Sequence, residues 1–332
     1  MATAEEAARG FLDSYVDDDG RVVRHDQGGD TVSEGQAYAM LVAAAIGDRK
    51  TFTDVWTWTT AHLLRPNGLL SWRWADGAVV DPSSASDADL DAARALVVAG
   101  RVFAAPDLVA EGVALGQAVL NLETVQTGAG RVLVAGDWAR SAPYPYNPSY
   151  ASPVATAVLA EASGDPRWAE LATGSRTVTA ALLAKADLPP DWAQVQQDGT
   201  VEAMPGALGR GVSVRYGYDA ARTPVRLAES CSAEDRALAA DMDTPLSRAG
   251  SGAQLDLGGT PLDDENSVVA AMGQAAAAAA AGDENGAVHA LGEASRLQEA
   301  ESTYYGAAWD ALGRALLTDD TLGGCPPLPR GD

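Results

Sequence analysis

The sequence predicts an all-α fold in one domain over residues 1–332, and three observations lead to this prediction. Alanine and leucine outnumber valine and isoleucine in most segments, and apolar residues recur at spacings of three and four rather than two. No linker rich in Pro, Ser or Gly divides the chain, and no repeat is visible. The pattern fits a ring of helical hairpins, with apolar inner and amphipathic outer helices, or a helical solenoid.

About a dozen helices are expected, and several begin at recognisable start signals. Ser33 precedes Glu34 and Gln36, Asp87 follows a run of serines, and the acids at 263–265 favour the positive end of a helix. The predicted helices span residues 4–16, 33–46, 51–64, 87–104, 106–122, 150–162, 165–184, 219–229, 232–241, 266–281, 283–297 and 302–317.

Three segments between these helices are long for plain connections. They span residues 65–86, 124–149 and 185–218, and they hold much of the Trp, Tyr, Pro and Gly content. Long connections of this kind usually carry function. We therefore expect them to form a substrate groove over one end of the helical domain.

Composition excludes several classes of function. The formal net charge is −23, which repels phosphate backbones and makes nucleic acid an unlikely partner. The chain has no apolar stretch of the roughly eighteen residues that a membrane span needs. Its 47% hydrophobic residues supply a full core, which excludes disorder.

The histidines and cysteines do not predict a metal site. The three histidines are isolated from one another, and Cys231 and Cys325 match no metal-ligand spacing. The two thiols can pair only if the tail near the C-terminus folds back onto the body of the protein, and the sequence leaves this open. The N-terminus lacks the pattern of a signal peptide, so either the protein is cytoplasmic or a leader was removed.

Acids and aromatic residues are the remaining candidates for chemistry. The chain contains no G-x-S-x-G, Walker or G-x-G-x-x-G motif, and scattered histidines argue against a Ser-His-Asp system. Carboxylates with aromatics are typical of carbohydrate processing. Glu34 at a helix start, and Asp87, Asp89 and Asp91 where a loop enters a helix, are candidates, although helix capping alone also explains such acids.

Several blocks follow one another along the chain: Asp19–Val22, Val32–Met40, Trp56 and Trp58, Trp72–Trp74, Ala85–Asp91, Tyr146–Tyr150, Pro190–Trp192, Tyr218–Arg222 and, more loosely, Tyr304 and Tyr305. Together these blocks resemble glycoside hydrolase family 8, which includes endoglucanases. Ala95, Leu96, Val97, Ala99 and Phe103 also fit its signature, whereas Ala92 replaces the usual Ile or Met, which is a change in packing only. The resemblance implies an (α/α)6 barrel, six inner helices ringed by six outer ones.

The resemblance also implies roles for the acids in an inverting hydrolysis without a cofactor. Glu34 is then the general acid, protonated near neutral pH, and Asp219 the general base. Asp87 would distort the sugar and raise the pKa of Glu34, while Asp89 and Asp91 are structural. Arg222 would hold a sugar hydroxyl or a carboxylate, although a plain surface ion pair also explains it.

Aromatic residues complete the expected substrate site. Trp74 and Trp138 are the first candidates for stacking on sugar rings, and Tyr150 and Tyr218 for hydrogen bonds near the scissile bond. Tyr304 or Tyr305 would line the leaving-group side. Four tryptophans within helical patterns, Trp56, Trp58, Trp168 and Trp309, are expected to be structural.

Alternative functions remain at this point. The leading hypothesis is an endo-β-1,4-glucanase, secreted or periplasmic and monomeric, with cello-oligosaccharides as its partner. Xylan, chitosan and mixed-linkage glucan are competing substrates, and the negative charge would attract cationic chitosan. Asp219 argues against chitosan, because chitosan-cleaving relatives place their base differently. A non-catalytic polysaccharide-binding relative and a magnesium enzyme using Asp87, Asp89 and Asp91 are further alternatives.

Overall fold

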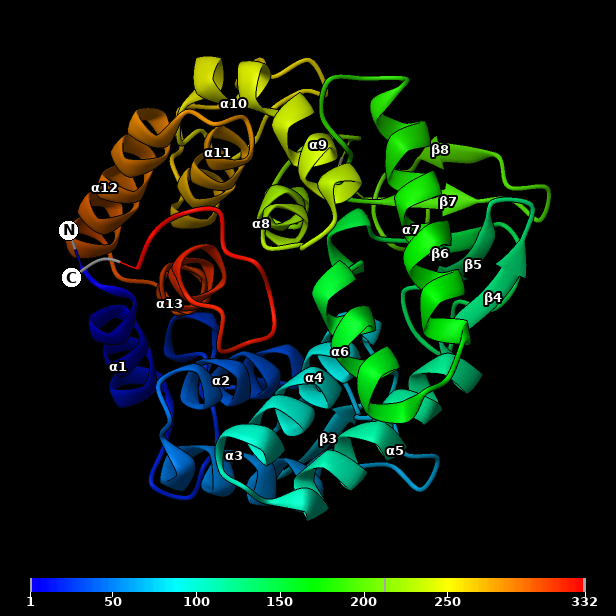
Figure 1. Cartoon of the computed structure of the whole chain (residues 1–332), viewed down its shortest axis with the longest axis vertical. Helices are drawn as coiled ribbons and strands as arrows, with labels where there is room; N and C mark the ends of the chain where they lie inside the picture. Colours follow the sequence, from blue (N-terminus) through cyan, green and yellow to red (C-terminus); the bar gives the residue numbers. More distant parts are fainter. Residues whose placement is uncertain (1, 212, 331–332) are drawn as a thin grey trace.

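The helices form two concentric rings in the computed structural model, which describes residues 2–211 and 213–330 (Figure 1). Each inner helix contacts the next one along the chain, and the last inner helix contacts the first, so the ring closes. This confirms the all-α prediction and excludes the open solenoid. The inner helices are α2 (Ser33–Ala45), α4 (Ser86–Val102), α6 (Pro153–Ser163), α8 (Thr223–Ala228), α11 (Val268–Ala280) and α13 (Tyr304–Thr318).

An outer helix packs against each inner one, which gives the (α/α)6 arrangement. Outer helices bury one face, whereas α2, α4, α11 and α13 are buried along almost their whole length. None of the helices described is long and apolar enough to span a bilayer. The outer helices are α1 (Ala4–Tyr15), α3 (Arg49–His62), α5 (Pro106–Leu122), α7 (Arg167–Leu183), α9 (Ala233–Asp241) and α12 (Glu284–Ala300).

One helix was not predicted. Helix α10 (Asp243–Ala249) follows α9 after a single residue and packs against α9 and α11. Its seven residues include Pro245, which lacks an N–H and indicates a break when only the sequence is considered. The proline is tolerated here because it lies in the first turn of the helix, where that N–H would have no helical partner.

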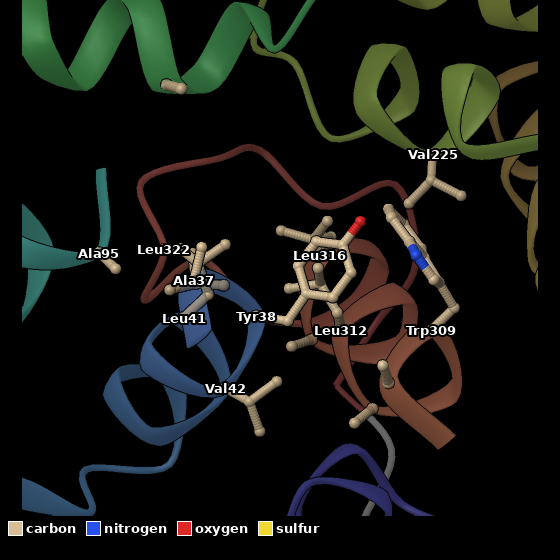
Figure 2. Close-up of a cluster of buried hydrophobic side chains, with 14 of the residues drawn as sticks. Ala37, Tyr38, Leu41, Val42, Ala95, Val225, Trp309, Leu312, Leu316 and Leu322 are labelled. Carbon is tan, nitrogen blue, oxygen red and sulfur yellow. The ribbon is translucent and has the colours of Figure 1, made fainter. Parts of the chain in front are cut away.

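Small and aromatic side chains allow the inner helices to approach one another. Helix α2 is rich in alanine, and Ala37, Ala39 and Ala43 have no exposed surface. Tyr38 packs its ring edge to face against Trp309 of α13, with ring centroids 5.5 Å apart (Figure 2). Trp309 has no exposed surface either, so the prediction that it is structural is confirmed.

Short antiparallel strands occupy the long connections, and the sequence did not predict them. Each has two to four residues, too few for an alternating pattern to be recognised. The strands form three small sheets: β1 (Thr31–Val32), β2 (Arg73–Ala75) and β3 (Ala78–Asp81); β4 (Thr124–Thr127) and β5 (Gly130–Leu133); β6 (Tyr144–Tyr146), β7 (Ala193–Val195) and β8 (Val201–Ala203).

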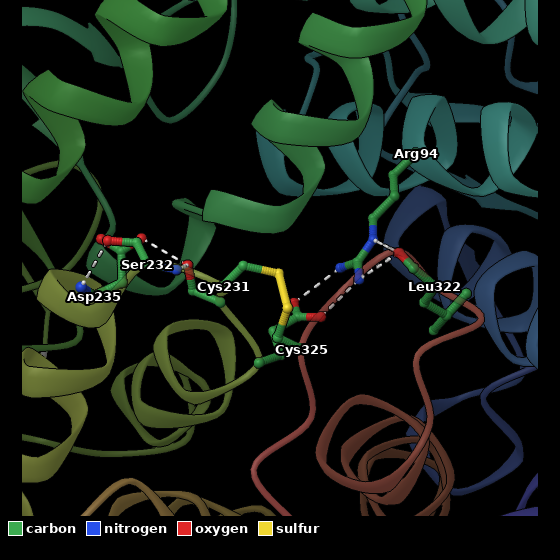
Figure 3. Close-up of a disulfide and its surroundings, with 8 residues drawn as sticks. Arg94, Cys231, Ser232, Asp235, Leu322 and Cys325 are labelled. Carbon is green, nitrogen blue, oxygen red and sulfur yellow. Dashed lines mark hydrogen bonds and ion pairs between the residues drawn. A yellow bond between two sulfur atoms is a disulfide. The ribbon is translucent and has the colours of Figure 1, made fainter.

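The chain after α13 folds back onto the inner ring. Cys325 forms a disulfide with Cys231, which answers the question that the sequence left open (Figure 3). The guanidinium of Arg94 donates to the carbonyl of Leu322 at 2.9 and 3.1 Å, and the Cys325 N–H donates to the carbonyl of Glu229 at 2.8 Å. The returning tail is therefore bound to α4 and to the segment that follows α8.

Candidate active site

Three inner helices begin close together, and each brings one of the predicted acids. Glu34 is the second residue of α2, and Asp87 is the second residue of α4. Asp219 directly precedes the 3-10 turn Ala220–Arg222, which leads into α8. The positive end of a helix dipole favours negative groups, so these positions suit carboxylates. Asp87 is not the N-cap of its helix, because Ala85 occupies that position.

Arg222 joins these three acids into one acid cluster, defined as Glu34, Asp87, Asp219 and Arg222. One guanidinium nitrogen donates to Glu34 Oε1 and, at 3.1 Å, to Asp87 Oδ2, while the other donates to Asp219 Oδ1 at 2.8 Å. Arg222 is only 2% exposed, so the reading of a surface ion pair is wrong. A single buried cation therefore holds carboxylates from three different helix starts.

A cavity of about 740 Å³ opens beside the acid cluster. Glu34 and Asp219 line it together with Tyr218, Tyr305 and residues at the starts of α11 and α13. Asp87 does not line it and is almost completely buried. Glu34 and Asp219 are thus the two acids of the cluster that face a space large enough for a ligand.

Burial and like charges change the acid strength of the cluster. Burial raises the pKa of Asp219 to about 6, although Arg222 opposes this shift, and the carboxylates of Asp191 and Glu34 add to it. Burial, with the nearby charge of Glu34, also raises the pKa of Asp87 well above its usual range. A carboxyl with a pKa near 6 is charged at pH 7 and still accepts a proton readily, which suits a general base.

Tyr38 supports Glu34 from one turn further along α2. Its hydroxyl donates to Glu34 Oε1 at 2.6 Å and accepts a hydrogen bond from Arg222 at 3.0 Å. The sequence analysis did not select Tyr38, because an aromatic residue inside an apolar inner helix is usually core. The spacing of four residues from Glu34, which places both side chains on one face of the helix, was the available signal.

The two candidate stacking tryptophans differ in how free their rings are. Trp74 on β2 is half-buried, it contacts Trp58 and His62, and the guanidinium of Arg21 lies 4.4 Å from its ring centroid. Trp138 is 40% exposed, and its N–H donates to the carbonyl of Ser84 at 3.2 Å, which holds the indole in place. Trp138 therefore offers the more accessible aromatic surface.

The two candidate tyrosines have different surroundings. Tyr150 is half-buried, and the Arg222 guanidinium lies 5.4 Å from its ring centroid. Tyr218 is 39% exposed, lines the cavity and packs edge-on against Tyr305. The Tyr305 hydroxyl donates to the Tyr218 carbonyl at 3.1 Å, so Tyr305 is tied to the segment that carries Asp219.

Starting in the acid cluster, three ion pairs join α4 to the segment 222–229, which contains α8. We call them the charge ladder: Asp87–Arg222, Asp91–Arg226 and Arg94–Glu229. Each pair joins residues 135 positions apart. The Arg94–Glu229 pair is bidentate, at 2.9 and 2.6 Å, and both side chains are almost fully buried. The last pair binds the disulfide-bonded tail: Arg94 donates to the Leu322 carbonyl, as Figure 3 shows, and the Glu229 carbonyl accepts the Cys325 N–H.

The three acids of the Asp87–Asp91 segment have separate partners. Asp87 binds Arg222, Asp89 accepts the N–H of Leu70 at 2.8 Å, and Asp91 binds Arg226. In residues 2–211 and 213–330 no group of three or more His, Cys, Asp or Glu side chains is arranged to hold a metal ion. The three acids therefore do not converge on one point where they could share a magnesium ion. Asp89 and Asp91 instead have partners within the fold.

Comparison with known proteins gives consistent matches. The model of glycosyl hydrolases family 8 matches residues 2–318. A protein of Novacetimonas hansenii named probable endoglucanase is 36% identical over 224 residues, which cover 65% of this chain and 64% of the relative. The chain thus spans just under two thirds of the length of this curated relative.

Solved structures match over nearly the whole chain. An endo-β-1,4-glucanase from Acetobacter xylinum has a TM-score of 0.78 at 27% identity, and the match covers 95% of this chain and 97% of the other. A β-1,3-1,4-glucanase from Paenibacillus sp. X4 has a TM-score of 0.83 at 20% identity, with 94% and 90% covered. The second match shows a shared fold.

Proposed function

Because the chain belongs to glycosyl hydrolases family 8, we propose that it is an inverting endo-β-1,4-glucan hydrolase, with Glu34 as general acid and Asp219 as general base. One observation carries the proposal. Glu34 and Asp219, which are far apart in the sequence, line the same cavity and bind the same guanidinium. The names of the similar endoglucanases support the reaction class.

In the proposed reaction the scissile bond of the glucan lies over the acid cluster. Glu34 donates a proton to the glycosidic oxygen as its bond to C1 breaks. A water attacks C1 from the opposite face of the sugar and gives its proton to Asp219, so the new reducing end has the inverted configuration. This geometry requires a separation of roughly 6.5–9.5 Å between the two carboxyl groups, which leaves space for the water.

The other predicted residues hold the substrate. Asp87 is proposed to bind the sugar at the point of cleavage and to help distort it, which requires the sugar to reach beyond the cavity lining, because Asp87 does not line the cavity. Trp138 and Trp74 stack on sugar rings, and on Trp74 a sugar has access only to the ring surface that Arg21 leaves uncovered. Tyr150 and Tyr218 donate hydrogen bonds to sugar hydroxyls near the point of cleavage. No step of this reaction needs a metal or another cofactor.

The charge of the cavity supports an uncharged glucan as substrate. Besides Glu34 and Asp219, the lining contains Asp26, Glu265 and Glu301, against Arg24 as a basic residue. An acidic lining repels polymers of uronic acids and tolerates neutral chains. The β-1,4-glucan is preferred over xylan and mixed-linkage glucan because of the similar endo-β-1,4-glucanases. Chitosan is the charged competitor and belongs in the same assay.

The deciding experiment is a product assay on cellohexaose, xylohexaose and chitosan hexamer, with the anomer followed by NMR. We expect cellohexaose to be cut internally and the α-anomer to appear first. Glu34→Gln should lower kcat by about 10³-fold, because the leaving group loses its proton donor. The matched control is Glu284→Gln, which changes a glutamate in the first turn of outer helix α12 and should retain full activity.

Other outcomes would change the proposal in defined ways. Binding of oligosaccharides without cleavage by the wild type would favour the non-catalytic relative. An initial β-anomer would indicate retention and a different role for Asp219. Turnover of Glu34→Gln near the wild-type rate would exclude this residue as the acid.

We further propose that the protein works outside the cytoplasm, secreted or periplasmic, and as a monomer. The disulfide between Cys231 and Cys325 supports the location, because such bonds persist in oxidising compartments and are rare in the cytosol. Fractionation of producing cells tests the location, and sedimentation of the purified protein tests the oligomeric state.

A further inference from the structure

The turn that carries Asp219 is held by a second carboxylate, that of Asp191. Asp191 Oδ1 accepts the N–H of Gly217 at 2.8 Å and the N–H of Ala220 at 2.9 Å. These two amides lie on either side of Tyr218 and Asp219. One oxygen atom of Asp191 therefore fixes the backbone both before and after the proposed base.

Asp191 is itself built firmly into this region. Its N–H donates to the carbonyl of Arg215 at 2.8 Å, and the Arg215 guanidinium lies 3.5 Å from Asp191 Oδ2. A Cβ atom at Gly217 would lie 2.6 Å from Asp191 Oδ2, so the carboxylate packs where only glycine leaves space. Asp191 and the segment Arg215–Ala220 thus form one tightly packed unit.

The charge of Asp191 also acts on Asp219. The groups that face Asp219 are the Arg222 cation, the carboxyls of Glu34, Asp87 and Asp191, and the phenols of Tyr150 and Tyr305. Arg222 favours the charged form of Asp219, and the neighbouring carboxylates disfavour it. Among these acids, Asp191 is the one that does not bind Arg222 and instead contacts Arg215.

We propose that Asp191 is a positioning residue for the general base, because its carboxylate holds the Gly217–Ala220 turn and its negative charge makes Asp219 a stronger base. This inference rests on the proposed function, in which Asp219 accepts the proton of the attacking water. Asp191 does not touch the reacting atoms in this scheme. It acts through the backbone and through the electrostatic potential at Asp219.

The test compares the pH profile of kcat/KM for the wild type, Asp191→Asn and Asp191→Ala on cellohexaose. Since the pKa of Asp219 is about 6 and the base must be ionised, wild-type activity should fall as the pH drops below about 6. Asp191→Asn keeps an oxygen for the two N–H groups and removes the charge. Its acid limb should move to lower pH by about half to one unit.

Asp191→Ala removes both the charge and the hydrogen-bond acceptor. We expect kcat to fall by about 10²-fold with KM little changed, because a displaced base no longer orients the water. The matched control is Asp256→Asn. Asp256 Oδ1 also accepts two backbone N–H groups, those of Gly258 and Thr260 at 2.9 and 2.8 Å, without belonging to the groups that face Asp219. This variant should keep the wild-type pH profile.

The two levels of the proposal fail in different ways. Asp219→Asn is measured in parallel. If this variant is inactive while both Asp191 variants keep the wild-type pH profile and rate, the inference about Asp191 is wrong and the assignment of Asp219 as the base stands. Full activity of Asp219→Asn would instead overturn the assignment of the base. Urea denaturation of each variant shows whether a lost rate reflects unfolding, and a rate loss in Asp191→Asn without a shifted acid limb would also count against the role of the charge.

Discussion

The upper end of the charge ladder is the pair Asp87–Arg222, and the lower end is the pair Arg94–Glu229. Both pairs join an arginine to a carboxylate across the same two segments, but they differ in the number of carboxylates that each arginine binds. At the upper end Arg222 is shared by Glu34, Asp87 and Asp219. At the lower end Arg94 binds one carboxylate, that of Glu229, and uses its remaining donors on the Leu322 carbonyl. Both arginines are buried, so the burial of the cation does not distinguish the two ends.

The number of carboxylates per arginine affects how readily the carboxyl groups take up protons. A buried pair of one cation and one anion is satisfied when both groups are charged, and removing either partner strongly lowers the stability of the fold. Burial raises the pKa values of Asp87 and Asp219, and neighbouring carboxyls add to the rise because three carboxyls around one cation cannot all be ionised at low cost. This difference supports the proposed proton transfer at the upper end, whereas the matched pair at the lower end suits a structural role.

A third pair shows that a shifted pKa alone does not identify a catalytic group. Burial raises the pKa of Asp89 to about 8 and raises that of Glu123 well above its usual range. Asp89 accepts the Leu70 N–H and Glu123 accepts the Ser84 hydroxyl, and neither lines the cavity. Asp219 combines a raised pKa with access to the cavity, whereas Asp89 and Glu123 have a raised pKa without that access.

The largest expected effect comes from removing the cation at the upper end. Arg222→Met should lower kcat on cellohexaose by about 10³-fold, because Glu34 and Asp219 lose the group that holds both. The free energy of unfolding should fall less than in the corresponding change at the lower end, since acids that face the cavity can be hydrated or protonated. Steady-state kinetics and urea denaturation measure the two effects. A stable variant with wild-type kcat would contradict this account of the upper end.

The same substitution at the lower end should have the opposite balance. Arg94→Met leaves the buried carboxylate of Glu229 without its partner, and the free energy of unfolding should fall by about 3–5 kcal/mol. Activity per folded molecule should stay near the wild-type value. Adding Glu229→Leu removes the unpaired charge and should recover most of the lost stability, as followed by urea denaturation. Failure of this rescue would show that the hydrogen bonds to Leu322 dominate.

The smallest expected effect comes from releasing the tail that the lower end binds. The disulfide closes a loop with a sequence separation of 94, and Cys231→Ser with Cys325→Ser should lower the free energy of unfolding by about 2–4 kcal/mol. Activity at 25 °C should be unchanged, because the tail contacts the lower end of the ladder and not the cavity. Reduction of the wild type with dithiothreitol provides an independent comparison. A loss of activity before unfolding would connect the tail to the acid cluster.

Most helices could be predicted because their signal is local. A spacing of three and four between apolar residues depends only on neighbours in the sequence, and it located the helices of both rings. The short strands and α10 could not be located in this way, because a few residues carry too little pattern. The resemblance of ordered blocks selected Glu34, Asp87 and Asp219, but it assigned no partner to Tyr38 and no role to Asp191.

By itself the sequence determined which long segments are helical, which faces are apolar, and which acids stand at the helix starts, since these properties depend on residues a few positions apart. Only the tertiary structure decided that the ring closes, that Cys231 meets Cys325, and that Arg222 binds three acids at once. These contacts join distant parts of the chain, such as Arg222 and Glu34, which are 188 residues apart. Acid strength depends on the charges and burial that such contacts create, so the proton chemistry of the site is a property of the folded chain.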